Sequence, residues 1–567
     1  MSGHYSQFYI DKTNNPFSDT LLMGGLIRLC SDLHYFEYGV QGNSIISDQG
    51  SYYHVELESP ITLEMIERHS GKLMPARLIQ TTKNAANLPD DVVAYDYEQV
   101  KDDVSNFYAA LRNKQDAQFP TYDWYTLQAI NPAALPGYTS LLLNWRQVRG
   151  NADVLHLLFD LFQQTPNDVE QAKTIWKQID QWGISAEATA QQLYNPDQGK
   201  GQNKTKSSGV SIGNISNFWL IEWLKAIGFY EFAITRQVRG GKDRKTFVIA
   251  PVQLDYAEHQ AVFRAFVEEI SSETSIRFDI LAVLRYTKAL LQYRFQEDVD
   301  MLGNYVPQKT VRGFYTAFYK DMGNAVATMN LSFIALPGWI RIQSKDELSI
   351  YLDKDDGLLD ELIHMTRQFD ESISDAYHLL QSLRDFVSGN DLAAFFQFTN
   401  AFPAYYMGMR ERGKYAVNFT TTFIERLIMN TEEQLSDIIK SAGFKNIAYA
   451  IRQSTIIPQY RKKQGERKYD VRYGLGQELT RKSRYPAEFI AALSDFLHRY
   501  NAENAQIMET RPQPYRRSIL TSDIDEIVAL IDRFGSSTVA NLLIAYGYAR
   551  IPREDIPEEE NNDEETE

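Results

Sequence analysis

Cationic side chains that could hold a polyanion are concentrated in residues 451–486, where the charge is opposite to that of the whole chain. Ten lysines and arginines there face three acidic residues, which leaves a net charge of +7 in a protein whose total is −16. The ten are Arg452, Arg461, Lys462, Lys463, Arg467, Lys468, Arg472, Arg481, Lys482 and Arg484. A local reversal of charge on this scale is typical of a surface that binds nucleic acid.

Four tyrosines are interleaved with these cations: Tyr460, Tyr469, Tyr473 and Tyr485. Aromatic rings and guanidinium planes stack on exposed bases, so the pattern favours DNA or RNA. The alternative is a solvated helical face whose cations pair with acidic neighbours, which is the ordinary use of a basic run. The nucleic-acid hypothesis therefore requires that these cations are not neutralised by the protein's own carboxylates.

A second set of cations falls on a predicted β-hairpin. Two strand-like runs flank the sequence RGGKDRK, whose paired glycines are typical of a tight turn. The predicted tip presents Arg236, Arg239, Lys242, Arg244 and Lys245 against a single acidic residue. A two-stranded ribbon that ends in cations could enter a groove of duplex DNA or hold its backbone.

A third set lies in residues 195–211, NPDQGKGQNKTKSSGVS, which combine glycine and serine with Lys200, Lys204 and Lys206. This composition predicts a flexible loop that cannot bury a core. Lysines on such a loop could close over phosphates, or they could serve only to keep a linker solvated. The sequence leaves both alternatives open.

Catalytic and metal-binding patterns are missing from the sequence. Cys30 is the only cysteine, which excludes an intramolecular disulfide and a thiolate-rich zinc site. The nine histidines form no metal-binding motif, and the sequence contains no Walker A loop, nucleophile elbow or dinucleotide fingerprint. Glu466 and Lys468 match the E-x-K of metal-dependent nucleases, but they fall among predicted helices rather than on a strand. We expect a protein without catalytic activity or cofactors.

The length of 567 residues exceeds what one core supports, so more than one domain is expected. We predict an α+β protein with a mixed α/β domain over residues 1–340, an all-helical bundle over 341–552 and a disordered acidic tail over 553–567. The tail holds nine acidic residues and one arginine, which accounts for half of the net negative charge. No signal peptide or long apolar run is present, so we expect a cytoplasmic protein without membrane contact.

Several local patterns define the expected elements of the first domain. A helix is predicted over residues 15–33, where Gly24 and Gly25 would let another backbone come close. Strands are predicted within residues 40–57, and a buried helix is predicted to end at Gly228. Residues 255–335, which include the aromatic run RGFYTAFYKDM, show helical spacing.

The expected elements continue into the second domain. Residues 339–352 show a short strand signal. Beyond them all segments look helical, with Gly443 ending one helix and Pro486 beginning another.

These pieces together resemble the large subunit of type I CRISPR Cascade complexes, in particular the smaller variants of type I-A and I-B systems. NPFSDTLLMGGLIRL is similar to the family's asparagine-proline-aromatic-x-aspartate opening. The segments NFWLIEWLKAIGFY, AFFQFTNAFPAYY, GFKNIAYAIRQST, VRYGLGQELTRKSRYPAEFI and LLIAYGYAR also resemble members of the family. The likeness is spread over most of the chain and no single motif is diagnostic.

The resemblance implies an RNA-guided complex for antiviral defence, or for transposition in transposon-encoded relatives. This subunit would recognise the flanking motif (PAM) in double-stranded DNA and stabilise the R-loop with its displaced single strand. Its partners would be the guide RNA, the backbone, 5′-handle-capping and small subunits, and in some relatives transposition proteins. Two alternatives remain open: a metal-dependent nuclease that uses Glu466 and Lys468, and an assembly protein whose basic stretch meets an acidic partner.

Overall fold

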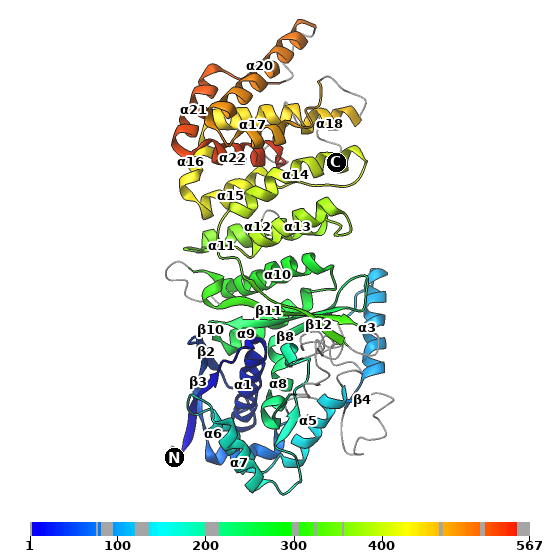
Figure 1. The fold of residues 1–567 in the computed structure, drawn as a ribbon, viewed down its shortest axis with the longest axis vertical. Coiled ribbons are helices and arrows are strands. Elements are labelled where there is room, and N and C mark those ends of the chain that lie inside the picture. Colours follow the sequence, from blue (N-terminus) through cyan, green and yellow to red (C-terminus); the bar gives the residue numbers. More distant parts are fainter. Residues whose placement is uncertain are drawn as a thin grey trace, which may run out of the picture. The chain divides into compact units, whose positions relative to one another are not determined.

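The structure is a computed structural model that divides into two compact units (Figure 1). It describes residues 3–74, 78–80, 94–118, 135–198, 215–296, 305–322, 326–353, 357–463, 469–510 and 516–552. Unit 1 comprises Met1–Ser275 and Pro307–Leu336, and unit 2 comprises Ile276–Val306 and Pro337–Glu567. The second division, after Leu336, falls close to the boundary expected after residue 340. The prediction missed that the chain enters unit 2 once before, at Ile276.

The first layer of unit 1 is an antiparallel sheet in the order β1-β3-β2-β10. Its strands are β1 (His4–Asp11), β3 (Tyr52–Thr62), β2 (Ser44–Asp48) and β10 (Gln253–Asp255). Side chains along β3 alternate between buried and solvent-facing positions, as the sequence predicts for a half-buried strand. Helix α1 (Pro16–Tyr38) packs on this sheet and begins at the Asn15 cap.

Two helices cross in unit 1 with their backbones in contact. The crossing joins α1 to α8 (Trp219–Phe232), and the glycines expected on α1 make it possible. A Cβ atom on Gly25 would lie 2.0 Å from the carbonyl oxygen of Leu224, and one on Gly228 would lie 1.8 Å from that of Leu21. Gly228 therefore lies inside α8 at the crossing, and the prediction that it ends the helix was wrong.

The second sheet of unit 1 has the order β12-β11-β9-β8 and is antiparallel throughout. It consists of β8 (Ala233–Gln237), β9 (Arg244–Pro251), β11 (Val311–Asp321) and β12 (Val326–Ala335). The helical prediction for residues 311–335 was wrong, because aromatic residues at 314, 315, 318 and 319 satisfy helical spacing as well as a strand. Pairing with neighbours on both sides fixes β11 as a strand.

Further helices surround the sheets of unit 1. They are α2 (Leu63–His69), α3 (Tyr97–Arg112), α5 (Leu135–Val148), α6 (Ala152–Leu161), α7 (Val169–Ile179) and α9 (Tyr256–Glu269). Four short strands, β4 (Leu78–Gln80), β5 (Ala94–Asp96), β6 (Glu187–Thr189) and β7 (Ser216–Phe218), form two small ladders. The ring of Phe266 on α9 stacks on Phe314 at 5.7 Å, which packs α9 against the second sheet.

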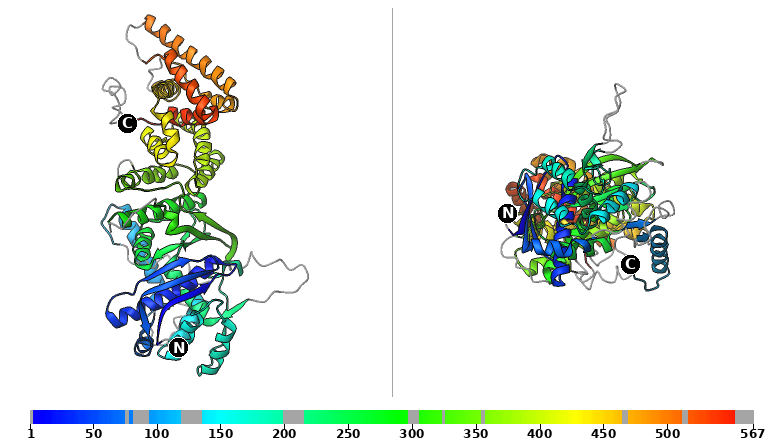
Figure 2. Two further views of the ribbon diagram at one scale, coloured as in Figure 1. Left: turned by 90° about the vertical axis from the view of Figure 1, so that its left-hand side faces the viewer. Right: turned by 90° about the horizontal axis from the view of Figure 1, so that it is seen from below.

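Unit 2 is built from helices, and the described part of it contains no extended strand (Figures 1 and 2). Its helices are α10 (Ser275–Gln296), α11 (Lys345–Leu352), α12 (Leu358–Arg367), α13 (Ser374–Val387), α14 (Ala393–Glu411), α15 (Thr421–Thr431), α16 (Ser436–Lys440), α17 (Ala442–Ser454), α18 (Ile456–Lys463), α19 (Leu475–Lys482), α20 (Pro486–Thr510), α21 (Thr521–Phe534) and α22 (Ser536–Tyr548). The predicted α+β class is therefore confirmed, with Pro486 beginning α20.

Two local predictions in unit 2 were wrong. Residues 345–352 form α11 instead of a strand, because the Ser344 hydroxyl accepts the backbone N–H of Glu347 and caps a helix. Gly443 lies in the first turn of α17, where a Cβ atom would meet the carbonyl oxygen of Asp523 at 2.7 Å. That glycine permits close packing against α21 rather than ending a helix. None of the described helices has the length and apolar character needed to cross a bilayer.

Candidate nucleic-acid interface

The predicted hairpin exists as strands β8 and β9, joined by residues 238–243 with Gly240 at a positive φ of 92°. It is part of the second sheet and not a free ribbon, because β9 also pairs with β11. Arg239 and Lys242 lie on the turn with exposed side chains. The sheet therefore holds these two cations at one of its ends.

A further cation, Lys320, lies at the same end and was missed in the sequence. Strands β9 and β11 are antiparallel, with Tyr319 opposite Arg244, so the last residues of β11 lie beside the first residues of β9. Lys320 is exposed there, and the backbone N–H of Asp321 donates to the Asp243 carboxylate at 3.0 Å. A strand assignment for residues 311–321 would have placed Lys320 next to the turn. We name Arg239, Lys242, Arg244 and Lys320 the cationic sheet end.

The charges at this end are available to different degrees. Arg239, Lys242 and Lys320 form no ion pair with any residue that the structure describes. Arg244 is half-buried, and burial lowers the pKa of its guanidinium while Tyr97 and Asp321 act in the opposite direction. An arginine stays charged despite such a shift, so Arg244 adds a fourth positive charge to this end.

Two of the hairpin residues expected to bind DNA are buried instead. Arg236 is 1% exposed, and its guanidinium donates to the carbonyl oxygens of Val267 and Ile270 at the end of α9. Lys245 is also buried, with its ammonium group 5.7 Å from the centre of the Phe247 ring. Strand alternation turns both side chains to the buried face of the sheet, so neither is exposed for the DNA contact that was predicted for it.

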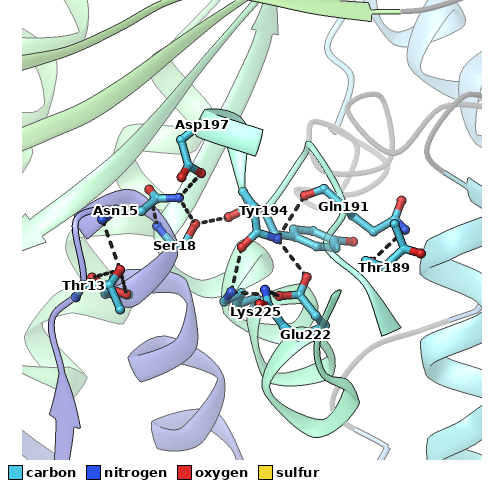
Figure 3. Close-up of polar contacts among 12 residues, drawn as sticks. Thr13, Asn15, Ser18, Thr189, Gln191, Tyr194, Asp197, Glu222 and Lys225 are labelled. Atoms are coloured by element: carbon cyan, nitrogen blue, oxygen red, sulfur yellow. Dashed lines mark hydrogen bonds and ion pairs between the residues drawn. The ribbon is translucent and has the colours of Figure 1, made fainter. Parts of the chain in front are cut away.

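The described residues that flank the lysine-bearing segment belong to a buried polar cluster (Figure 3). Glu222 on α8 accepts hydrogen bonds from Asn195 at 2.8 Å and from Asn217 at 2.7 Å, and it pairs with Lys225 at 2.8 Å. Asn195 precedes and Asn217 follows the lysine-bearing segment, so one carboxylate holds both of its ends. Lys200, Lys204 and Lys206 themselves lie outside the described residues.

Residues 192–197, which precede the lysine-bearing segment, are hydrogen-bonded to helix α1 and to strand β12. Asn15, the cap of α1, donates to the Asp197 carboxylate, and the Ser18 hydroxyl donates to the carbonyl of Tyr194 (Figure 3). Gln192 donates to the Thr328 hydroxyl on β12 at 2.7 Å. Residues 192–197 therefore have a fixed position between α1 and the strand that pairs with β11.

The basic stretch of unit 2 differs from its prediction, because several of its cations are already neutralised. Lys462 pairs with Glu411 at 2.7 Å, Lys482 pairs with Glu488 at 2.8 Å, and Arg472 pairs with Glu503. Hydrogen bonds from Lys462 and Tyr473 lower the pKa of the Glu411 carboxyl to about 2. The expectation that these three cations are free of the protein's own carboxylates was wrong.

The other cations of the stretch fall into three groups. Arg452 is buried and donates to the carbonyls of Tyr546 and Ala549, so it is not exposed for the DNA contact that was predicted for it. Arg481 and Arg484 are exposed and form no ion pair with described residues, while Arg461 on α18 is half-buried. Arg467, Lys468 and the side chain of Lys463 lie outside the described part.

The tyrosines of the stretch also divide between structural and exposed positions. Tyr469 is buried beneath Arg516, whose guanidinium carbon lies 3.4 Å from the ring centre. Arg410 approaches the ring of Tyr460 at 5.6 Å. Tyr473 and Tyr485 are exposed, so only these two rings present a large accessible surface.

Catalysis or metal binding would need acidic, histidine or cysteine side chains to gather among the described residues. No cluster of three or more histidine, cysteine, aspartate or glutamate side chains that could hold a metal ion occurs among them. Burial raises the pKa of Asp19 to about 6, but its carboxylate accepts the backbone N–H of Thr13 at 2.7 Å and the Thr13 hydroxyl. Asp19 therefore acts as a local brace at the start of α1. Glu466 and Lys468, the proposed nuclease pair, lie outside the described residues.

No protein-family model matches the sequence, and no curated protein matches it either. The likeness to the Cascade large subunit therefore stays a prediction from the residues quoted for it.

Proposed function

We propose that the chain is a non-catalytic, nucleic-acid-binding subunit of an RNA-guided complex of the type I Cascade kind, acting in the cytoplasm. In this proposal, unit 1 engages duplex DNA through the cationic sheet end, and unit 2 contacts a displaced strand. The observation that carries the proposal is the exposure of Arg239, Lys242 and Lys320, which have no ion-pair partner among the described residues, at one end of a rigid sheet. Such an arrangement suits the phosphate backbone of a duplex.

The experiment is a charge reversal at this end. Binding of the triple variant Arg239→Glu, Lys242→Glu and Lys320→Glu to a fluorescent 30-base-pair duplex is measured by anisotropy across a salt series. Each lost phosphate contact lowers the salt slope by about 0.9, so we expect a decrease of roughly 2.7. All three side chains are exposed, so the thermal midpoint should stay near that of the wild type.

A matched control changes the net charge equally elsewhere in unit 1. Arg149, Lys177 and Arg264 are exposed, and their reversal to glutamate should leave the slope within about 0.5 of the wild type. An unchanged slope in the first variant, or equal losses in both, contradicts duplex binding at the cationic sheet end.

The RNA-guided part of the proposal has its own test. The tagged protein purified from its own cells should carry a CRISPR RNA, and its absence contradicts that part alone.

A second candidate function is an assembly protein whose basic stretch meets an acidic partner, and ion pairs within unit 2 leave fewer cations of that stretch for either DNA or such a partner. The ion pairs of Lys462, Arg472 and Lys482 with glutamates give those cations a structural role. If the chain only assembles other proteins, neither triple variant should change DNA affinity, because no DNA contact would exist to lose.

A further inference from the structure

An exposed aromatic patch lies at the far end of α1 from the Asn15 cap. Tyr35, Tyr38 and Val40 are 51%, 60% and 66% exposed, and they fall within six positions, 35–40, in which Glu37 is the only charged residue. The 23 residues of α1 span about 34 Å at roughly 1.5 Å per residue, which separates this patch from the polar cluster at the helix start. Rings of this size are favoured anchors of protein interfaces.

Hydrogen bonds hold the backbone around the patch in place. Gly39 ends α1 with a positive φ of 77°, and its N–H donates to the Tyr35 carbonyl at 2.9 Å. The buried ring of His34 bonds the Ser59 carbonyl at 2.7 Å and lies 5.5 Å from the ring of Tyr38. The end of β3 is thus joined to the end of α1, and the rings stand on a fixed surface rather than on a loose loop.

Three acidic side chains lie on the elements that contact this end of α1. Glu58 near the end of β3, and Glu64 and Glu67 on α2, are exposed and form no ion pair with described residues. Helix α2 packs against both α1 and β3, and the contacts of its Arg68 and His69 with Glu37 place it beside the end of α1. The nearby cation Arg68 is already paired with Glu37 at 2.6 Å. Lys72 is exposed there without an ion pair to a described residue, so three unpaired glutamates stand against one unpaired lysine, and the balance attracts positive charge.

One contact on this surface illustrates how a basic side chain can lie there. The Lys72 ammonium group is 5.8 Å from the centre of the Phe36 ring, beside Tyr35. Lysine and arginine stems cover aromatic surface while their charged ends reach carboxylates. An incoming basic segment could repeat this contact on Tyr35 and Tyr38 and pair with the three glutamates.

We propose that Tyr35, Tyr38 and Val40, with Glu58, Glu64 and Glu67, form a docking surface for a partner protein that presents a lysine- or arginine-rich segment. The occupant follows from charge complementarity, because the surface is apolar at its centre and acidic at its rim. This surface is separate from the cationic sheet end, and the inference does not depend on the proposed function.

The test places the photo-cross-linking residue p-benzoylphenylalanine at position 40 of the full chain, which is expressed in its own cells. We expect a covalent adduct with one protein, mapped by mass spectrometry to a segment rich in lysine and arginine. Glu58→Lys, Glu64→Lys and Glu67→Lys together should lower the adduct yield roughly tenfold, because like charges then oppose docking.

The control reverses three exposed acidic residues elsewhere in unit 1, Asp116, Glu268 and Glu269, and should leave the yield unchanged. Circular dichroism confirms that each variant is folded. The proposal is overturned by the absence of a protein adduct, by an adduct with nucleic acid or with the chain's own helical unit, or by a mapped segment without cations. It is also overturned if the glutamate reversal and the control lower the yield equally.

Discussion

The cationic sheet end of unit 1 and the basic stretch of unit 2 differ less among the described residues than their sequences suggest. Three cations of the sheet end, and two of the stretch, Arg481 and Arg484, are exposed without an ion pair to a described residue. The stretch has the larger charge, +7 over 36 residues, yet three of its cations pair with glutamates and a fourth, Arg452, is buried. A polyanion responds to the number of cations without an ion pair rather than to the total charge, because a lysine that is already neutralised attracts little.

Sequence distance explains why the difference was hidden. Glu411 and Glu503, which neutralise Lys462 and Arg472, lie 51 and 31 residues away and reach them only through helix packing. Only Glu488 is close to its partner, six residues after Lys482. A count over a sequence window cannot detect carboxylates that the fold brings in from other helices.

The largest expected effect is on the free energy of unfolding, which should fall when a buried arginine is removed but not when an exposed one is. Arg452→Ala should lower the free energy of unfolding by about 3 kcal/mol, because it leaves a cavity and deprives two buried carbonyls, those of Tyr546 and Ala549, of their donor. Arg239→Ala should change it by less than about 0.5 kcal/mol. Urea unfolding of the full chain, followed by tryptophan fluorescence and circular dichroism, measures both. Similar losses of unfolding free energy in the two variants would contradict the distinction between a buried arginine in the basic stretch and an exposed one at the cationic sheet end.

Acidification should destabilise unit 1 through His259, which is buried against Phe232 at a ring distance of 4.1 Å. Burial lowers the pKa of His259 to about 4, below its unfolded value of 6.5. Between these two pKa values His259 is neutral in the folded state and protonated in the unfolded state. Its contribution to the free energy of unfolding is therefore fully present above pH 6.5 and is lost as the pH decreases toward 4. Between pH 7.5 and 5 the loss is about 2 kcal/mol.

The measurement compares the wild type with His259→Leu, because Asp19 acts in the opposite direction. Burial raises the pKa of Asp19 to about 6, so the folded state takes up a proton before the unfolded state does and gains stability as the pH falls. The free energy of unfolding of the wild type, minus that of His259→Leu, should decrease steadily from pH 7.5 to 5. A difference that stays constant over this range would mean that His259 is not kept neutral by burial.

The parts of the fold that could be predicted are those set by local chemistry. Gly25 on α1 indicated a close helix crossing, Pro486 marked the start of α20, and the glycines at 240 and 241 marked a hairpin turn. Lys320 could not be placed, because the aromatic spacing of residues 314–319 suits a helix until pairing with β9 and β12 is known. Glu222 was missed for a related reason, since its two asparagine partners lie 27 and 5 residues away and carry no motif.

A smaller effect is expected from the exposed part of the basic stretch. Arg481 and Arg484 have no ion-pair partner among the described residues, and the ring of Tyr485 beside them is exposed. The double variant Arg481→Gln and Arg484→Gln should lower the salt slope for a single-stranded 20-mer by about 1.4, at roughly 0.7 for each contact. An unchanged slope would remove Arg481 and Arg484 from strand binding.

The smallest effect is expected when the same charge is removed from the paired lysines. Lys462→Gln and Lys482→Gln also delete two positive charges, but each lysine already lies against a glutamate, at 2.7 and 2.8 Å. Such a pair is nearly neutral toward an approaching strand, so few counterions are released there, and the slope should stay within about 0.3 of the wild type. If this variant instead matches the loss in the arginine variant, the glutamates do not hold the lysines in solution. In that case net charge, and not pairing, would govern binding by the basic stretch.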